Sequence, residues 1–166
     1  MSHFGAVLTA ADLHALARAM EDRAAERYRE LAEAFEVSCN PDTAKAFREL
    51  AEVESRHAAE FPAAAGPLPE ILAQCETDPE IADPDAVHYL MHPWHAFDLA
   101  LRHEKKAVTF FQELAANTSV PEVRAAALRL VEREQGHVAH VEQRLAQLPV
   151  PPAGWDEDED PPNWDM

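Results

Sequence analysis

The segments VESRHAAE (residues 53–60) and VEREQGHVAHVE (residues 131–142) each place a Glu-x-x-His unit within a helical pattern of apolar residues. The apolar residues recur at spacings of three and four, which indicates amphipathic helices with one face turned inward. Glu54 and His57, like Glu134 and His137, fall on those inward faces. Because side chains at i and i+3 share a helix face, each unit points a carboxylate and an imidazole at the core. The sequence therefore predicts helices packed around polar groups.

Two more glutamates, Glu21 and Glu104, also fall on apolar helical faces. Glu21 precedes Glu54 by 33 residues, and Glu104 precedes Glu134 by 30. Each second glutamate is followed by a histidine three residues later. This spacing indicates an internal repeat of one helical hairpin, and it predicts a pseudo-twofold axis through the polar site.

Local signals set the ends of these helices. Thr9 with Asp12 three residues later is typical of a capping box, and Asn40 followed by Pro41 is typical of a second helix start. Glycine is scarce, with 4 in the chain, whereas alanine, leucine, glutamate and arginine dominate, which favours helix. The sequence predicts helices over about residues 10–35, 41–61, 92–117 and 121–148.

Short links join the first helix to the second and the third to the fourth, so each pair is expected to form an antiparallel hairpin. A proline-rich connection over about residues 62–92, with short helical pieces at 69–74 and 85–90, is long enough to cross the bundle. The expected fold is all-α: an antiparallel four-helix bundle of two hairpins in one domain, residues 1–148. Residues 149–166 form a proline-rich acidic tail.

The tail has a composition typical of disordered segments. Trp155 and Trp164 nevertheless favour packing of the tail on its own bundle or on a neighbouring subunit.

The formal charge of −17 disfavours binding to nucleic acid and to anionic membranes. No apolar run approaches the roughly 20 residues that cross a bilayer, and the N-terminus does not resemble a signal peptide. Cys39 and Cys75 are isolated, which is typical of reduced thiols. We therefore expect a cytoplasmic protein that contacts neither nucleic acid nor membrane.

Four inward carboxylates need an explanation. A single inward glutamate is usually a rim residue that reaches solvent, and a purely structural bundle of that kind is one alternative. Burying a carboxylate costs several kcal/mol, and four would offset most of the roughly 5–15 kcal/mol that stabilises a small domain. No lysine or arginine lies on the inward stripes to balance them, whereas two divalent cations would. Four carboxylates and two imidazoles without thiolate favour iron or manganese over structural zinc, although zinc is able to substitute.

This pattern resembles the rubrerythrin branch of the ferritin-like di-iron carboxylate proteins, over about residues 10–147. The resemblance implies a ferritin-like bundle with two iron ions held by Glu21, Glu54, His57, Glu104, Glu134 and His137. It further implies that Glu21 and Glu104 are terminal ligands and that Glu54 and Glu134 bridge the ions. Tyr28, seven residues after Glu21, would orient a ligand carboxylate through its hydroxyl. Phe111 stands in its place in the second half.

The chain also departs from its relatives. Full-length rubrerythrins carry a rubredoxin-like domain with paired C-x-x-C motifs, which this sequence lacks, so an electron donor would be a separate protein. The additional third-helix carboxylate of rubrerythrins has no counterpart near Glu104, where Ala100 and His103 stand. Ser55 replaces the haem-ligating methionine of bacterioferritins, so no haem is expected.

Two functions remain open at this stage. The first is a non-haem di-iron oxidoreductase that reacts with hydrogen peroxide or dioxygen. The alternative is an iron-binding protein with ferroxidase-like activity and no dedicated reductive turnover. A homodimer is the expected assembly, because bundles of this family commonly pair.

Overall fold

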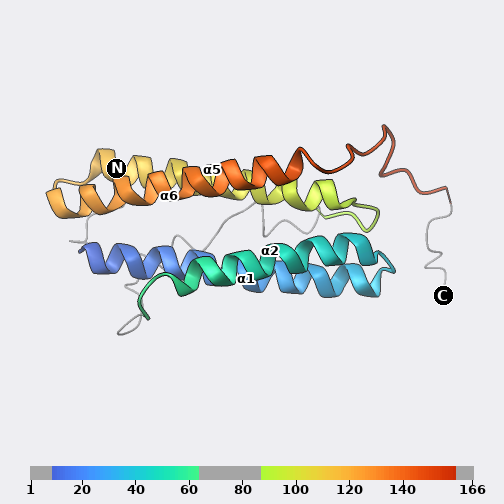
Figure 1. Cartoon of the computed structure of the whole chain (residues 1–166), viewed down its shortest axis with the longest axis horizontal. Coiled ribbons are helices and arrows are strands. Elements are labelled where there is room, and N and C mark those ends of the chain that lie inside the picture. The colour runs from blue at the N-terminus through green and yellow to red at the C-terminus, as the bar shows by residue number, and fades with distance from the viewer. Residues whose placement is uncertain (1–8, 64–86, 160–166) are drawn as a thin grey trace, which may run out of the picture.

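The computed structural model describes residues 9–63 and 87–159. These ranges contain four helices and no strand, in two antiparallel hairpins that lie side by side (Figure 1). The helices are α1 (Ala10–Val37), α2 (Pro41–Ala59), α5 (Pro93–Asn117) and α6 (Pro121–Leu145). The all-α bundle predicted from the sequence is confirmed. The proposed helical piece at 69–74 and the expected domain boundary at 148 stay predictions, and the first lies outside the described residues.

The caps confirm the predicted start of the first hairpin. The Thr9 hydroxyl accepts a hydrogen bond from the Asp12 backbone N–H (3.1 Å), and the Asp12 carboxylate accepts the Thr9 N–H (2.8 Å). Asn40 accepts the Thr43 N–H at the start of α2. Cys39, between the helices, has φ 57°, a left-handed conformation that reverses the chain within a short link.

The second hairpin begins at prolines. Pro93 and Pro121 occupy the first turns of α5 and α6, where a missing backbone N–H costs no hydrogen bond. His92 caps α5, and its backbone N–H donates to Nδ1 of His95 (2.9 Å). The predicted helical piece at 85–90 is wrong for its described part: residues 87–90 are not helical, and the Met91 N–H donates to the His88 carbonyl to close a turn over 88–91.

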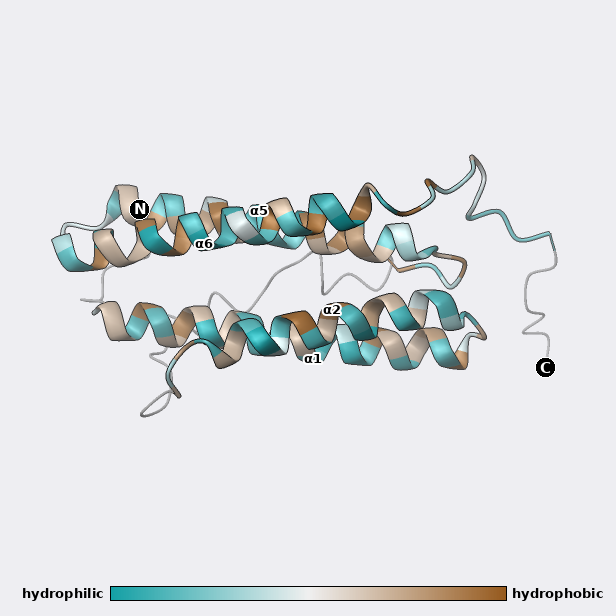
Figure 2. Ribbon diagram, in the orientation of Figure 1, coloured by the Kyte–Doolittle hydropathy of each residue, from teal (hydrophilic) through white to brown (hydrophobic). Residues whose placement is uncertain are grey.

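Apolar side chains fill the two ends of the bundle. Each helix alternates apolar and polar residues along its length, as the hydropathy colours show (Figure 2). One cluster contains Tyr28, Phe35 and Phe47, and the other contains Leu13 and Phe111. Helices α1, α5 and α6 each contribute to both clusters, whereas α2 contributes to the first and Phe61, just beyond its end, to the second. The buried glutamates lie between the residues of the two clusters along the chain. The core therefore has a polar layer between two apolar ends.

The start of the tail packs on the bundle. The rings of Trp155 and His95 lie 3.9 Å apart, and Trp155 covers the cluster that contains Phe47. The Tyr89 hydroxyl hydrogen-bonds the carboxylate of Asp158. The expectation that Trp155 anchors the tail on its own bundle is confirmed, whereas Trp164 lies outside the described residues.

Among the helices that the structure describes, none combines the length and the apolar character that a membrane span requires.

Candidate metal centre

Four glutamates, one from each helix, meet in the polar layer. Glu21, Glu54, Glu104 and Glu134 are 5%, 1%, 2% and 3% exposed, respectively. The alternative that they are rim residues reaching solvent is therefore wrong. Their burial follows from helical periodicity, because each stands in the apolar stripe of its own helix.

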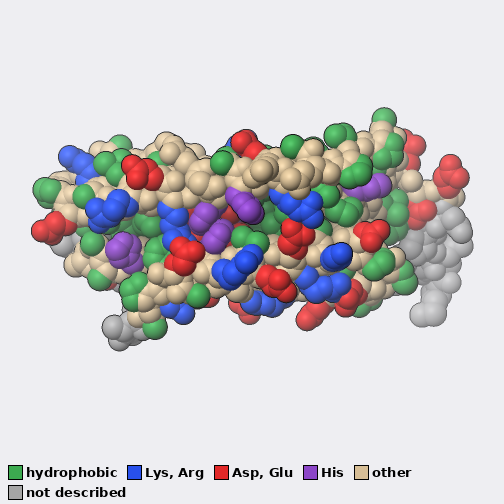
Figure 3. Space-filling view, in the orientation of Figure 1, with side chains coloured by type: hydrophobic (Ala, Val, Ile, Leu, Met, Phe, Trp, Pro, Cys, Tyr) green, Lys and Arg blue, Asp and Glu red, His purple; other side chains and the backbone are tan. Residues whose placement is uncertain are grey.

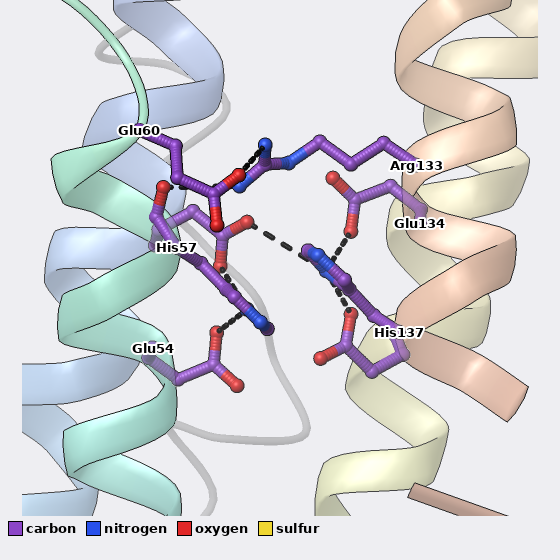
Figure 4. A network of polar contacts seen from close by, with 8 residues as sticks. Glu54, His57, Glu60, Arg133, Glu134 and His137 are labelled. Carbon is purple, nitrogen blue, oxygen red and sulfur yellow. Dashed lines mark hydrogen bonds and ion pairs between the residues drawn. The ribbon is translucent and has the colours of Figure 1, made fainter. Parts of the chain in front are cut away.

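The two histidines complete this layer and point toward each other from α2 and α6 (Figure 4). The rings of His57 and His137 stack at 3.7 Å with only 6° between their planes. Nδ1 of His57 lies 3.5 Å from Glu54 Oε2 and 3.8 Å from Glu21 Oε2. Nδ1 of His137 lies 3.1 Å from Glu134 Oε2 and 3.6 Å from Glu104 Oε2. The six candidate ligands are thus brought together, three from each hairpin.

Overlapping triplets of these residues offer ligand atoms close enough to share one cation. The atoms of each triplet lie within 4.8 Å of one another. The triplets are Glu21, His57 and His137; Glu54, His57 and Glu104; and Glu104, Glu134 and His137. Since they share members, the three triplets form one continuous group of candidate ligands.

Several of these polar atoms lack a hydrogen-bond partner within the described part of the chain. They are Glu21 Oε1, Glu54 Oε2, Glu104 Oε1 and His57 Nδ1, all buried. Buried polar atoms are nearly always satisfied, so a group of unsatisfied carboxylate and imidazole atoms in one layer fits a site that binds a cation. The donor set of carboxylates and imidazoles without thiolate fits iron or manganese. The residues present therefore fit a dinuclear carboxylate centre.

Comparison with known proteins agrees with this geometry. The Rubrerythrin family model matches residues 14–143, which span all six candidate ligands. The chain belongs to the rubrerythrin family.

The fold of this rubrerythrin-family chain is also similar to a crystal structure, at 2.00 Å resolution, of an uncharacterised conserved protein from Magnetospirillum magnetotacticum MS-1. The two are 33% identical with a TM-score of 0.58, and the alignment covers 87% of this chain and 99% of the other. No curated protein matches the sequence.

Burial changes the protonation of the carboxylates. It raises the pKa of Glu21 to about 10, and the hydrogen bond with Glu54 and the charge of Glu54 add to this shift. Burial also raises the pKa of Glu54 and of Glu104 to about 7. Without a cation, this rubrerythrin-family centre therefore keeps protons on part of its carboxylates at neutral pH.

The two histidines shift in opposite directions. Burial, followed by the charges of His137 and Arg133, lowers the pKa of His57 to about 4. Burial alone would lower the pKa of His137, but hydrogen bonds to Glu104 and Glu134 outweigh it and raise the pKa to about 10. At neutral pH the positive charge of the stacked pair therefore lies on His137.

Arg133 is a neighbour of the centre that the sequence did not reveal. Its Nη1 contacts Glu60 Oε2 at 2.5 Å, and its Nη2 donates to the backbone carbonyl of His57 at 3.0 Å. Arg133 stands four residues before His137, and Glu60 three after His57, so helical spacing alone would place each beside a ligand. Their contact depends on the register between α2 and α6, which no local pattern encodes.

The histidines form the outer edge of the centre. Their side chains are 18% (His57) and 12% (His137) exposed, whereas the four glutamate side chains are 6% exposed or less. Histidine side chains gather in the middle of one face, between the two hairpins (Figure 3).

Tyr28 is fully buried, with its ring 6.0 Å from that of Phe47. Its suggested role toward a ligand carboxylate stays a prediction. His140, three residues after His137, is exposed on α6.

Proposed function

We propose that this protein is a non-haem di-iron oxidoreductase of rubrerythrin type that reacts with hydrogen peroxide or dioxygen. The observation that supports this most is the layer of four buried carboxylates and two stacked imidazoles, with acceptor atoms that no donor in the described chain satisfies. Two iron ions are the proposed cofactor, with manganese or zinc as substitutes.

Each hairpin supplies the ligands of one ion in this proposal. Glu21, Glu54 and His57 would hold the first, and the equivalent three residues of α5 and α6 would hold the second. Glu54 and Glu134 would bridge the two, as the family resemblance implies. When bound, two ferrous ions supply the two electrons that reduce hydrogen peroxide, with two protons, to water.

The chain's own groups perform three tasks around this chemistry. The apolar clusters at both ends exclude bulk water, which strengthens electrostatic interactions in the polar layer. The carboxylates balance the charge of the cations. The protons that Glu21 and His137 hold in the metal-free protein leave when cations bind, so metal uptake releases protons.

A second candidate is iron binding with ferroxidase-like activity and no dedicated reductive turnover. One observation favours it: beside Glu104 on α5 stand Ala100 and His103, with no additional carboxylate. We also propose a separate electron-donor protein and a second copy of this chain as partners.

The decisive experiment measures iron per chain in protein purified from iron-supplemented cells. The wild type and the Glu52→Ala control should hold about two iron ions, because Glu52 is exposed on the same helix. Glu54→Ala should hold far less. Iron-free wild type, even after anaerobic reconstitution with ferrous iron, would show that the proposed centre is wrong.

Kinetics then separate the two candidates. An oxidoreductase should oxidise its bound ferrous iron faster with hydrogen peroxide than with dioxygen, and a donor protein should re-reduce it for repeated turnovers. A single slow oxidation, with no re-reduction by any supplied donor, would favour iron handling.

A further inference from the structure

His57 and His137 occupy different places on their helices. His57 lies in the last turn of α2, which ends at Ala59, whereas His137 lies two turns before the end of α6 at Leu145. At the end of α2 the His57 carbonyl accepts the Glu60 backbone N–H at 3.2 Å, a bond of the tighter i→i+3 kind, and terminal turns open most readily. A ligand in the last turn therefore needs support from outside its helix.

Arg133 supplies that support from α6. It donates from Nη2 to the His57 carbonyl at 3.0 Å, while Nη1 binds Glu60 at 2.5 Å. Its guanidinium also lies 4.4 Å from the centre of the Phe61 ring. In Figure 4, Arg133 spans the gap between the hairpins beside the two imidazoles. The His57 carbonyl, the Glu60 carboxylate and the Phe61 ring, all at or just beyond the end of α2, thus contact the same side chain. This Arg133 side chain is 21% exposed.

The internal repeat places no arginine on α2 at the position equivalent to Arg133 of α6. Arg133 immediately precedes Glu134, and the corresponding residue before Glu54 is Val53, whose side chain cannot donate a hydrogen bond. The support is therefore specific to the His57 side of the centre.

A second arginine of α6 makes similar contacts away from the ligands. Arg144 binds Glu49 with two hydrogen bonds, at 2.9 and 3.1 Å, and lies over the Phe97 ring. Arg144 follows Arg133 by 11 residues and Glu49 precedes Glu60 by 11, as expected for antiparallel helices in one register. Arg144 thus links the same two helices, and it contacts no candidate ligand in these hydrogen bonds.

We propose that Arg133 is a positioning residue for His57: it holds the last turn of α2 against α6 so that the imidazole stays directed at the ion shared with Glu21 and Glu54. This inference rests on the proposed dinuclear centre. The hydrogen bond to a helix-terminal carbonyl also places a positive charge where the α2 dipole is negative, which adds to the stability of that turn.

The test uses Co²⁺ titration of the metal-free full-length protein, followed by calorimetry and visible absorption. Arg133→Met should weaken the binding of one of two ions by about ten-fold or more, the size of effect typical of residues that orient a ligand. Arg133→Lys should recover part of that loss, because lysine still donates one hydrogen bond. Arg144→Met, the matched control, should leave both affinities within about two-fold while losing a similar amount of urea stability.

A double-mutant comparison shows whether Arg133 acts through His57. In a His57→Ala background, Arg133→Met should lower the affinity of the remaining ion by less than about two-fold, and in a His137→Ala background by the full ten-fold. Equal affinities of Arg133→Met and Arg144→Met, with two ions bound by the wild type, would overturn this inference and leave the proposed function standing. A wild type that binds no Co²⁺, Zn²⁺ or Fe²⁺ would overturn both.

Discussion

The hairpins α1–α2 and α5–α6 contribute the same kinds of groups to the centre and surround them differently. Each brings one carboxylate from its first helix and a Glu-x-x-His unit from its second. The first hairpin has the buried Tyr28 seven residues after Glu21 and its histidine at a helix end, whereas the second has Phe111 at the equivalent position and a mid-helix histidine. The two hairpins therefore repeat the candidate ligands but not the residues that surround them. We expect the two ions to bind with different affinities.

The largest effect should come from removing one histidine at a time. His57→Ala and His137→Ala should each reduce the bound metal from about two ions per chain to about one. The ion that remains in His57→Ala should bind more tightly, because His137 is fixed within a helix on both sides. Elemental analysis with competitive titration measures both quantities. Equal residual affinities would mean that the hairpins are equivalent.

The stability of the metal-free protein should depend on pH through the buried groups of the centre. Glu21 and His137 have pKa values of about 10 in the folded state, above their ordinary values of 4.5 and 6.5. The folded state therefore binds more protons than the unfolded chain, and the free energy of unfolding should fall as pH rises from 7 toward 10. Each group contributes up to about 1.4 kcal/mol per pH unit.

The contribution of His57 to the free energy of unfolding should change with pH in the opposite direction. Its pKa is lowered from 6.5 to about 4, so its contribution is present above pH 6.5 and is lost as pH falls toward 4. Urea unfolding across this range should show that His137→Gln flattens the alkaline slope and that His57→Gln changes only the acid side. Metal-loaded protein should show the reverse alkaline trend, since binding requires deprotonated ligands.

Replacing a terminal carboxylate should separate stability from function. Glu21→Leu and Glu104→Leu should stabilise the metal-free protein by about 1–4 kcal/mol, because an unsatisfied polar group leaves the core. Both should abolish binding of one ion. Glu52→Leu on the exposed side of α2 should change stability by less than about 0.5 kcal/mol. Destabilisation by both core variants would show that the carboxylates support the apo fold.

The smallest effect should follow from making the first hairpin resemble the second. Tyr28→Phe should lower the affinity for one ion by up to about ten-fold, because the family resemblance implies that the hydroxyl orients a ligand. Tyr89→Phe is a control, because its hydroxyl contacts Asp158 in the tail. Identical metal titrations of both variants would show that Tyr28 contributes to packing and not to metal binding.

The sequence predicted most of the scaffold because its signals are local. Thr9, Pro41 and Pro121 mark helix starts within a turn of their own position, and the first helix ends at Val37, two residues beyond the expected Phe35. The six central residues were predicted for a similar reason. Helical periodicity assigns each to the inward face without any knowledge of its partners.

Contacts between hairpins could not be predicted in this way. The Arg133–Glu60 pair joins residues 73 apart, and it exists only in one register of α2 against α6. The stacking of His57 on His137 also depends on that register. Likewise, the adjacent residues Leu16 and Ala17 are both buried, because a helix between two neighbours buries a wider face than a single stripe.

The exposure of the centre is one-sided, since the imidazoles reach solvent and the carboxylates do not. A chelator approaching from solution would therefore meet the histidine edge first, and the carboxylates would still hold the ions from behind. Exchange of metal with the medium should then be limited by imidazole departure, so small chelators should strip the protein much faster than bulky ones of equal affinity.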